Sequence, residues 1–273
     1  MKKIIQVVLL QVIFFYSLKA QKTIVHYLSG IDKDHTVQWD FFCTKGMNNG
    51  KWSRIAVPSN WEQQSFGAYS YGHDKVKTDE QGLYKYSFNA ARQWSNKKVF
   101  IVFEGSMTDT EVKINGKIAG PVHQGGFYRF KYDITGLLQY GADNLLEVTV
   151  SKMSAEASVN RAERNGDFWT LGGIYRPVYL EIVPQAFIDR IAIDARADGS
   201  FNMDVFAMNV SRGATIEAKV QKLNSTAPTL NIIPITITWS TPACTTKKFS
   251  SLRNLCMACM MAVTAPAWMI SGI

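Results

Sequence analysis

The sequence predicts an all-β protein, in which a jelly-roll β-sandwich is followed by an incomplete immunoglobulin-like β-sandwich. Between residues 36 and 184, short segments alternate apolar and polar residues, and this period of two is typical of half-buried strands. Loops rich in Gly, Asn and Asp separate these segments, and no long segment has the periodicity of an amphipathic helix. Short strands at this spacing favour a sandwich or a jelly roll.

Local patterns predict the individual strands of the first domain. Residues 83–88 (LYKYSF) place three aromatic rings on one face and polar side chains on the other. Residues 128–132 and 146–150 repeat this alternation. Residues 98–104 (KVFIVFE) are apolar on both faces, so we expect this strand in the middle of the sandwich.

The connections between these strands also carry signals. Asn115-Gly116 predicts a tight hairpin turn, because both central residues of such a turn need a positive φ. Residues 153–166 (MSAEASVNRAERNG) are polar and do not alternate, so we expect a long loop. Three large aromatic residues are expected to anchor the core: Trp52, Trp61 and Phe66.

A second set of strands begins after Pro184. Residues 187–195, 200–209 and 214–222 predict three successive strands, whereas an immunoglobulin sandwich needs about seven. The second sandwich is therefore expected to be incomplete and to expose an unpaired strand edge. The predicted organisation is a signal peptide at 1–20, the jelly roll at 21–184, the partial immunoglobulin-like domain at 185–222, and an aberrant tail at 223–273.

The first twenty residues have the pattern of a secretory signal peptide. Lys2 and Lys3 precede an apolar run, and Ala20 ends it with a small residue. The run is too short and too interrupted for a stable membrane span, which needs about 20 apolar residues. We expect export to the periplasm or the extracellular space, with an uncleaved N-terminal anchor as the alternative.

The C-terminal tail differs in composition from the rest of the chain. Residues 218–273 contain no Asp or Glu, whereas the preceding residues contain all 22 acids. We interpret the tail as the product of a frameshift or of a mispredicted gene end. Of the 30 basic residues, three lie in residues 1–20 and five in residues 218–273, which leaves 22 bases against 22 acids. The body between them is formally neutral, so the net charge of +8 does not indicate nucleic-acid binding.

The sequence offers no catalytic residue, metal site or cofactor motif. Glycoside hydrolysis needs two carboxylates that flank the scissile bond, and no pair in this chain is identifiable. A Gly-x-Ser-x-Gly elbow and phosphate-binding loops are missing as well. Cys43 is interpreted as a buried thiol, and Cys256 and Cys259 have metal or redox spacing without partner ligands.

The stretch 165–169 (NGDFW) is the first candidate binding site. The carboxylate of Asp167 can accept two hydrogen bonds from sugar hydroxyls, and the indole of Trp169 can cover the apolar face of a pyranose ring. The alternative is structural, because Asp often stabilises turns and Trp often belongs to a core.

The second candidate is the loop 68–74 (AYSYGHD). Its aromatic rings and polar tips, with Tyr71 and His73 foremost, suit stacking on a sugar and hydrogen bonding to it. Packing of the loop against its own domain would explain the same composition. His73 has no second His or Cys at ligand spacing, so we do not expect a metal there.

Taken together, these segments resemble a known family. The landmarks in order are WDF (39–41), WSRIAVPSNWE (52–62), GLYKYSF (82–88), VFIVFEG (99–105), VKINGK (112–117), FYRFKYDIT (127–135), GADNLLEVTV (141–150) and DFWTLGGIYRPVYLE (167–181). This order resembles the galactose-binding-like, N-terminal sugar-binding domain of glycoside hydrolase family 2, which includes β-galactosidases, β-glucuronidases and β-mannosidases. The resemblance covers residues 36–184, and residues 187–222 resemble the start of the family's immunoglobulin-like domain.

The resemblance has implications for the site. It implies that Asp167 reaches into an active site and binds substrate hydroxyls, and that the loop with Tyr71 and His73 approaches the same pocket. It also implies a (β/α)₈ barrel that packs beside the jelly roll and holds two catalytic glutamates. No segment of this chain matches that barrel, so we expect the chain by itself not to hydrolyse a glycoside.

Three functions are compatible with the sequence. The chain could be the N-terminal carbohydrate-binding portion of an exported family 2 enzyme that acts on β-linked sugars. It could instead be a free-standing carbohydrate-binding protein, or a truncated remnant without function. The ligand in the first two cases is a β-linked sugar or oligosaccharide.

Overall fold

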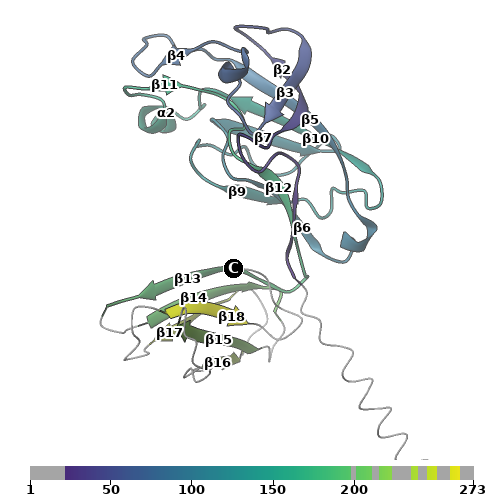
Figure 1. The fold of residues 1–273 in the computed structure, drawn as a ribbon, viewed down its shortest axis with the longest axis vertical. Coiled ribbons are helices and arrows are strands. Elements are labelled where there is room, and N and C mark those ends of the chain that lie inside the picture. Colours follow the sequence, from purple (N-terminus) through teal and green to yellow (C-terminus); the bar gives the residue numbers. More distant parts are fainter. Residues whose placement is uncertain are drawn as a thin grey trace, which may run out of the picture. The chain divides into compact units, whose positions relative to one another are not determined.

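A computed structural model describes residues 22–197 and 201–210, together with the backbones of strands at 215–222, 235–238, 245–250 and 259–264. The chain divides into two compact units. One unit spans Ile24–Ile182 and is called the sandwich unit below; the other comprises Met1–Thr23 and Val183–Ile273. Figure 1 shows the strands of both.

The sandwich unit consists of two main antiparallel sheets. The six-stranded sheet has the order β3-β2-β5-β10-β7-β8, and the four-stranded sheet has the order β1-β12-β6-β9. This architecture confirms the predicted all-β sandwich. The strands are β1 (Ile24–Tyr27), β2 (Val37–Cys43), β3 (Trp52–Val57), β5 (Gln81–Asn89), β6 (Lys98–Phe103), β7 (Asp109–Ile114), β8 (Lys117–Ile118), β9 (Phe130–Asp133), β10 (Asp143–Ser151) and β12 (Val178–Val183).

The centre of the six-stranded sheet shows how the sequence pattern sets the two faces. β5 pairs with β10 along its full length, with Tyr84 opposite Val148 and Lys85 opposite Glu147. Tyr84 and Val148 are buried, while Lys85 and Glu147 face outward. The period-two alternation therefore places apolar side chains in the core and charged side chains at the surface.

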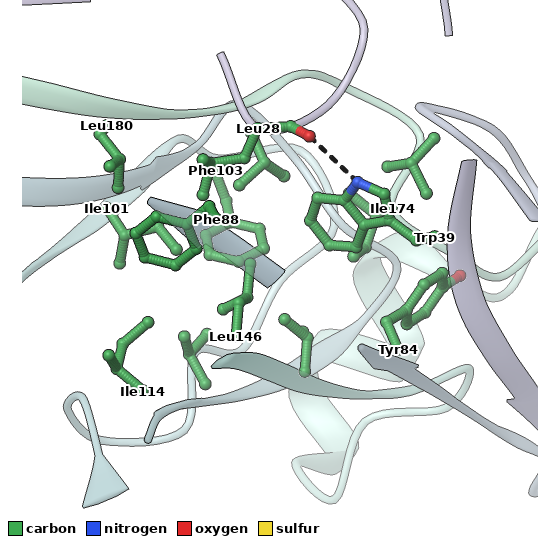
Figure 2. Packing of buried hydrophobic residues seen from close by; sticks show 14 of the residues in the cluster. Leu28, Trp39, Tyr84, Phe88, Ile101, Phe103, Ile114, Leu146, Ile174 and Leu180 are labelled. Atoms are coloured by element: carbon green, nitrogen blue, oxygen red, sulfur yellow. Dashed lines mark hydrogen bonds between the residues drawn. The ribbon is translucent and has the colours of Figure 1, made fainter. Parts of the chain in front are cut away.

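The core lies between the two main sheets. β6 lies between β12 and β9, in agreement with its apolar character on both faces, and Ile101 and Phe103 are fully buried. Trp39 is fully buried in the core, where its indole Nε1 donates a hydrogen bond to the backbone oxygen of Leu28 at 3.1 Å (Figure 2). Leu180 on β12 and Ile174, which precedes β12, belong to the same core.

The predicted hairpin is present between β7 and β8. Asn115 and Gly116 have φ of 53° and 76°, the left-handed conformation that this turn requires. The side chain of Asn115 also donates to the backbone oxygen of Leu137 at 3.0 Å, and its carbonyl oxygen accepts from the backbone N–H of Leu145 at 2.9 Å. The turn thus anchors a neighbouring loop and the adjacent strand β10.

Three local predictions about the sandwich unit need correction. The polar stretch 153–166 contains a short helix, α2 (Ala157–Glu163), whose first turn is capped by the carboxylate of Glu156. The strand expected at 128–132 begins at Phe130, and Tyr128 is exposed. Trp61 and Phe66 are buried as expected, but Trp52 is 48% exposed because it occupies an outward position of β3.

The second unit contains two three-stranded sheets. One has the order β13 (Phe187–Ala195), β14 (Phe201–Met208) and β17 (Thr245–Ser250), and the other has the order β16 (Ile235–Thr238), β15 (Thr215–Lys222) and β18 (Cys259–Thr264). The three strands expected before residue 223 are present, and three strands from the acid-poor tail pair with them. Cys256 lies outside the described residues. No helix in the described part of the chain is long and apolar enough to span a bilayer.

Candidate binding site

Two short strands build the candidate site at one end of the sandwich unit. β4 (Ser70–Tyr71) and β11 (Trp169–Thr170) pair antiparallel, with Tyr71 opposite Trp169 and Ser70 opposite Thr170 (Figure 1). The backbone N–H of Gly72 donates to the oxygen of Phe168 at 2.7 Å and extends this pairing. Two loops that lie about a hundred residues apart in the chain are thereby joined side by side.

Gly72 permits the close approach of these two loops. A Cβ atom at this position would lie 2.1 Å from the backbone oxygen of Gly166 and 2.7 Å from its nitrogen. Both are backbone atoms and cannot move aside as a flexible side chain could. The sequence therefore needs glycine at position 72 so that the Tyr71 loop can lie against the Asp167 loop.

The phenol of Tyr71 contacts Asp167 directly. Its hydroxyl donates a hydrogen bond to the Oδ1 atom of Asp167. This hydrogen bond is the main reason that the pKa of Tyr71 is raised, and slight burial and the negative charge of Asp167 act in the same direction. The phenol therefore remains a donor at neutral pH, and it orients an exposed carboxylate whose second oxygen is available to a ligand.

Aromatic rings surround this acid and phenol pair. Trp169 is 58% exposed, and its indole makes edge contacts with the rings of Tyr69 at 5.8 Å and Tyr71 at 5.2 Å between centroids. His73 makes an edge contact with Tyr71 at 5.9 Å. The structure thus brings together all four residues selected from the sequence, with His73 at the outer edge. Tyr69 is an additional member that the sequence analysis did not single out.

Local hydrogen bonds hold the loop that carries Tyr71 and His73. The carboxylate of Asp74 accepts from the backbone N–H of Tyr71 at 2.6 Å, and the N–H of Asp74 donates to the oxygen of Tyr71 at 3.0 Å. The ammonium of Lys77 donates to the same oxygen at 2.8 Å. These contacts fix the turn without using the side chains of Tyr71 and His73.

A buried ion cluster, formed by Glu62, Glu80 and Lys152, holds the two segments that carry the site residues. The ammonium of Lys152 lies 2.7 Å from a carboxylate oxygen of each glutamate, and all three side chains are fully buried. Glu62 accepts from the backbone N–H of Gly172 at 3.1 Å, and Glu80 accepts from the N–H of Ala68 at 2.8 Å. The cluster therefore connects the base of one site loop to the base of the other.

Arg164 adds a second cation next to this cluster. Its buried guanidinium donates through Nη2 to the backbone oxygen of Lys152 at 2.8 Å and also donates to the oxygen of Leu171. Burial lowers the pKa of Arg164, and the charge of Glu62 opposes that shift. Burial raises the pKa of Glu62 despite the neighbouring ammonium of Lys152. Burial thus opposes the charged form of both groups, and opposite charges and hydrogen bonds nearby offset that cost.

Sequence patterns did not lead us to predict the buried ion cluster. One local signal could have found it, because Lys152 comes directly after β10 and continues the inward phase of Val148 and Val150. An inward lysine needs a buried anion as its partner. Nothing in the local sequence marks Glu62 and Glu80 as those partners, since they lie about 90 and 72 positions away along the chain.

The chemistry of the candidate site is that of binding. It presents one hydrogen-bonded carboxylate, one phenol and exposed aromatic faces, which suit a polyhydroxylated ring with an apolar face. Within the described residues, no group of three or more His, Cys, Asp or Glu side chains could hold a metal ion.

Comparison with known proteins places this geometry in context. Residues 46–184 match the family model described as "Glycosyl hydrolases family 2, sugar binding domain". A β-galactosidase of Priestia megaterium is 28% identical over 166 residues, covering 55% of this chain and 16% of that protein. A β-glucuronidase of Formosa agariphila is 29% identical over 201 residues, covering 69% of this chain and 20% of that protein. The chain thus spans about a fifth or less of the length of these relatives.

Solved structures show the same fold. The β-glucuronidase 2 of Bacteroides uniformis matches with a TM-score of 0.64 and 20% identity, over 85% of this chain and 28% of that chain. A putative β-galactosidase from Bacteroides fragilis matches with a TM-score of 0.61 and 22% identity, over 85% of this chain and 36% of that chain.

Proposed function

This chain belongs to glycosyl hydrolase family 2, and we propose that it is the N-terminal carbohydrate-binding portion of an exported enzyme that acts on β-linked sugars. The observation that carries the proposal is the pairing of β4 with β11. This pairing sets the carboxylate of Asp167, the phenol of Tyr71 and the exposed indole of Trp169 next to one another. Export rests on the signal-like pattern of residues 1–20.

The roles of the site residues follow from their chemistry. Asp167 accepts hydrogen bonds from two sugar hydroxyls, and Tyr71 fixes the orientation of that carboxylate. Trp169 covers the apolar face of the ring, and His73 contacts a substituent at the rim. The surface is open, so we expect millimolar affinity, which corresponds to about −4 kcal/mol.

Hydrolysis needs more than this site supplies. A glycosidic bond is cleaved between two carboxylates about 5 to 9.5 Å apart, one of which donates a proton to the leaving oxygen. In the candidate site, Asp167 is already bound to a phenol, and the nearby carboxylate of Asp74 accepts a backbone hydrogen bond of its own turn. We therefore propose that the role of Asp167 is to hold substrate, that the catalytic carboxylates come from a barrel domain packed beside the sandwich unit, and that this chain alone is inactive.

The test compares three forms of the full chain. Ligand-observed NMR and calorimetry with methyl β-galactoside, methyl β-glucuronide and methyl β-mannoside measure the affinity of the wild type, of Asp167→Asn and of Asp79→Asn. Asp79 provides a matched control, because it is an exposed aspartate further along the same loop and pairs with the exposed Lys45. We expect Asp167→Asn to lose binding at least tenfold and Asp79→Asn to retain it.

Other outcomes distinguish the competing functions. Equal binding by both variants would contradict the role of Asp167. Micromolar binding by the chain alone would favour a free-standing carbohydrate-binding protein over a portion of an enzyme. A wild-type chain that binds no member of the panel and does not unfold cooperatively would favour a remnant without function.

A further inference from the structure

The outward face of the six-stranded sheet carries a row of five cross-strand neighbours that the candidate site does not use. The row begins with two aromatic residues and is called the Trp52 row below. Trp52 on β3 lies opposite Phe42 on β2, and their rings are 5.7 Å apart between centroids. Phe42 lies opposite Leu83 on β5, and Leu83 lies opposite Thr149 on β10. Glu111 on β7 completes the row opposite Thr149. The alternation of β3 forces this orientation of Trp52, because Ile55 and Val57 occupy the inward positions.

A row of alternating charges runs beside the Trp52 row. Across five neighbouring strands this row consists of Arg54, Asp40, Lys85, Glu147 and Lys113. Arg54 lies 2.8 Å from Asp40, and Lys85 lies 3.4 Å from Glu147. Lys113 lies 2.7 Å from Glu111 of the Trp52 row. The ammonium of Lys85 also lies 5.0 Å from the centroid of the Trp52 ring. Donors and acceptors thus alternate across five strands, directly next to an exposed indole.

Trp52 and the members of the two rows on β5, β10 and β7 line a shallow hollow of about 180 Å³. Trp52 and Leu83 form its apolar side, and Thr149 with the charged ends of Lys85, Glu111 and Glu147 forms its polar side. This volume is well below the roughly 300–1,000 Å³ of pockets that enclose drug-sized ligands. It suits one ring that lies flat against the sheet.

We propose that this hollow is a second carbohydrate-binding site, which takes one neutral pyranose unit of a glycan. The charges of Lys85 and Lys113 balance those of Glu111 and Glu147, so the hollow favours neither a polyanion nor a polycation. Sugar hydroxyls both donate and accept hydrogen bonds, and they complement a surface where donors and acceptors alternate. The indole of Trp52 supplies an apolar contact for the face of the sugar ring that carries C–H groups.

The hollow is separate from the Asp167 site and has none of its residues. The Asp167 site is carried by loops and by β4 and β11, whereas the residues that line the hollow come from β3, β5, β10 and β7. β5 begins directly after Glu80, and β10 ends directly before Lys152. A glycan held here would therefore be anchored on the sheet whose strands lead to the buried ion cluster under the Asp167 site.

The experiment uses the full chain and a panel of neutral probes: lactose, cellobiose and mannobiose. Indole N–H chemical shifts report contact at Trp52 and at Trp169 separately, once both signals are assigned by Trp52→Phe and Trp169→Phe. We expect a neutral probe to shift the Trp52 signal in the wild type and in Asp167→Asn alike. Trp52→Ala should weaken this binding at least tenfold without changing the unfolding transition, since Trp52 is half exposed.

A second variant keeps the test independent of any effect of Trp52→Ala on folding. Glu111→Gln changes one polar wall of the hollow at a partly exposed position and should weaken the same probe severalfold. The proposal is overturned if no neutral probe shifts the Trp52 signal, or if Trp52→Ala binds as the wild type does. Self-association of the wild type that Trp52→Ala abolishes would also overturn it, because the face would then be an interface between copies. If Asp167→Asn loses binding at Trp169 and keeps it at Trp52, the result supports a hollow that binds independently of the Asp167 site.

Discussion

The sandwich unit uses lysine and glutamate in two opposite ways. Below the Asp167 site, Lys152 lies between Glu62 and Glu80 with no exposure of any of the three side chains. On the outward face of the sheet, Lys85 pairs with Glu147 and both side chains are 30% to 42% exposed. The same residue types are thus essential to the structure in one place and nearly neutral to stability in the other.

Desolvation explains this difference. A buried charge that loses its partner cannot recover hydration, so the loss costs about 3–5 kcal/mol. An exposed pair is hydrated whether or not it forms, and its contribution is about 0–1 kcal/mol. The buried ion cluster should therefore determine whether the site loops hold together, while the outward charges remain available to a ligand.

The largest expected effect follows from removal of the buried cation. Lys152→Met leaves Glu62 and Glu80 buried without their ammonium, and we expect a loss of about 3–5 kcal/mol in the free energy of unfolding. Hydrogen exchange of the backbone amides of β5 and β10 in the full chain measures this loss within the sandwich unit. The matched control is Lys113→Met on the outward face, with an expected change of at most about 1 kcal/mol. Similar losses for the two variants would show that burial does not separate the two ion groups.

A smaller effect is expected where the site loops meet. Gly72→Ala places a Cβ against the backbone of Gly166, so the loops must move apart at a cost of about 1–3 kcal/mol. The pairing of β4 with β11 should weaken, and binding of methyl β-glycosides should fall at least tenfold. Gly136→Ala is the control, since nothing lies within 4 Å of the Cβ that it would add. Unchanged binding by Gly72→Ala would separate ligand binding from loop contact.

The smallest effect concerns the pKa of Tyr71, whose partner Asp167 is an exposed acid. The hydrogen bond to the Asp167 carboxylate and its charge raise the pKa of Tyr71 above the ordinary value of 10.0. Because the hydrogen bond and the charge both favour the protonated phenol, Asp167→Asn should lower this pKa toward 10.0, so the phenolate forms at lower pH than in the wild type. NMR titration of the ring carbon that bears the hydroxyl measures the shift. An unchanged pKa would show that the phenol does not bind Asp167 in solution, and Asp79→Asn serves as the control.

Local sequence patterns were sufficient to predict many of the strands and which of their faces is buried. The alternation in 83–88 and 146–150 predicted which residues of β5 and β10 face the core, because a strand presents successive side chains to opposite faces. Asn115-Gly116 predicted its turn, because few other residues adopt positive φ readily. Helix α2 escaped prediction because a helix of two turns has too few residues to show a 3.6-residue pattern.

Trp52 shows where such reasoning failed. Its size suggested a core position, but strand phase, rather than size, decides which face a side chain occupies. Ile55 and Val57 already marked the inward phase of this strand, and Trp52 lies in the other phase.

The sequence by itself determined the all-β class, many of the strands, the Asn115-Gly116 turn and the residue types available for binding, namely Asp167, Trp169, Tyr71 and His73. These depend on interactions between residues close together in the chain, whose period and conformation are visible in the letters. Only the tertiary structure decided that Tyr71 binds Asp167, that Lys152 joins Glu62 to Glu80, and that Trp52 lies beside a row of alternating charges. Each of these contacts joins segments far apart in the sequence, and the partner of a side chain is set by which strands and loops pack together, not by its own neighbours.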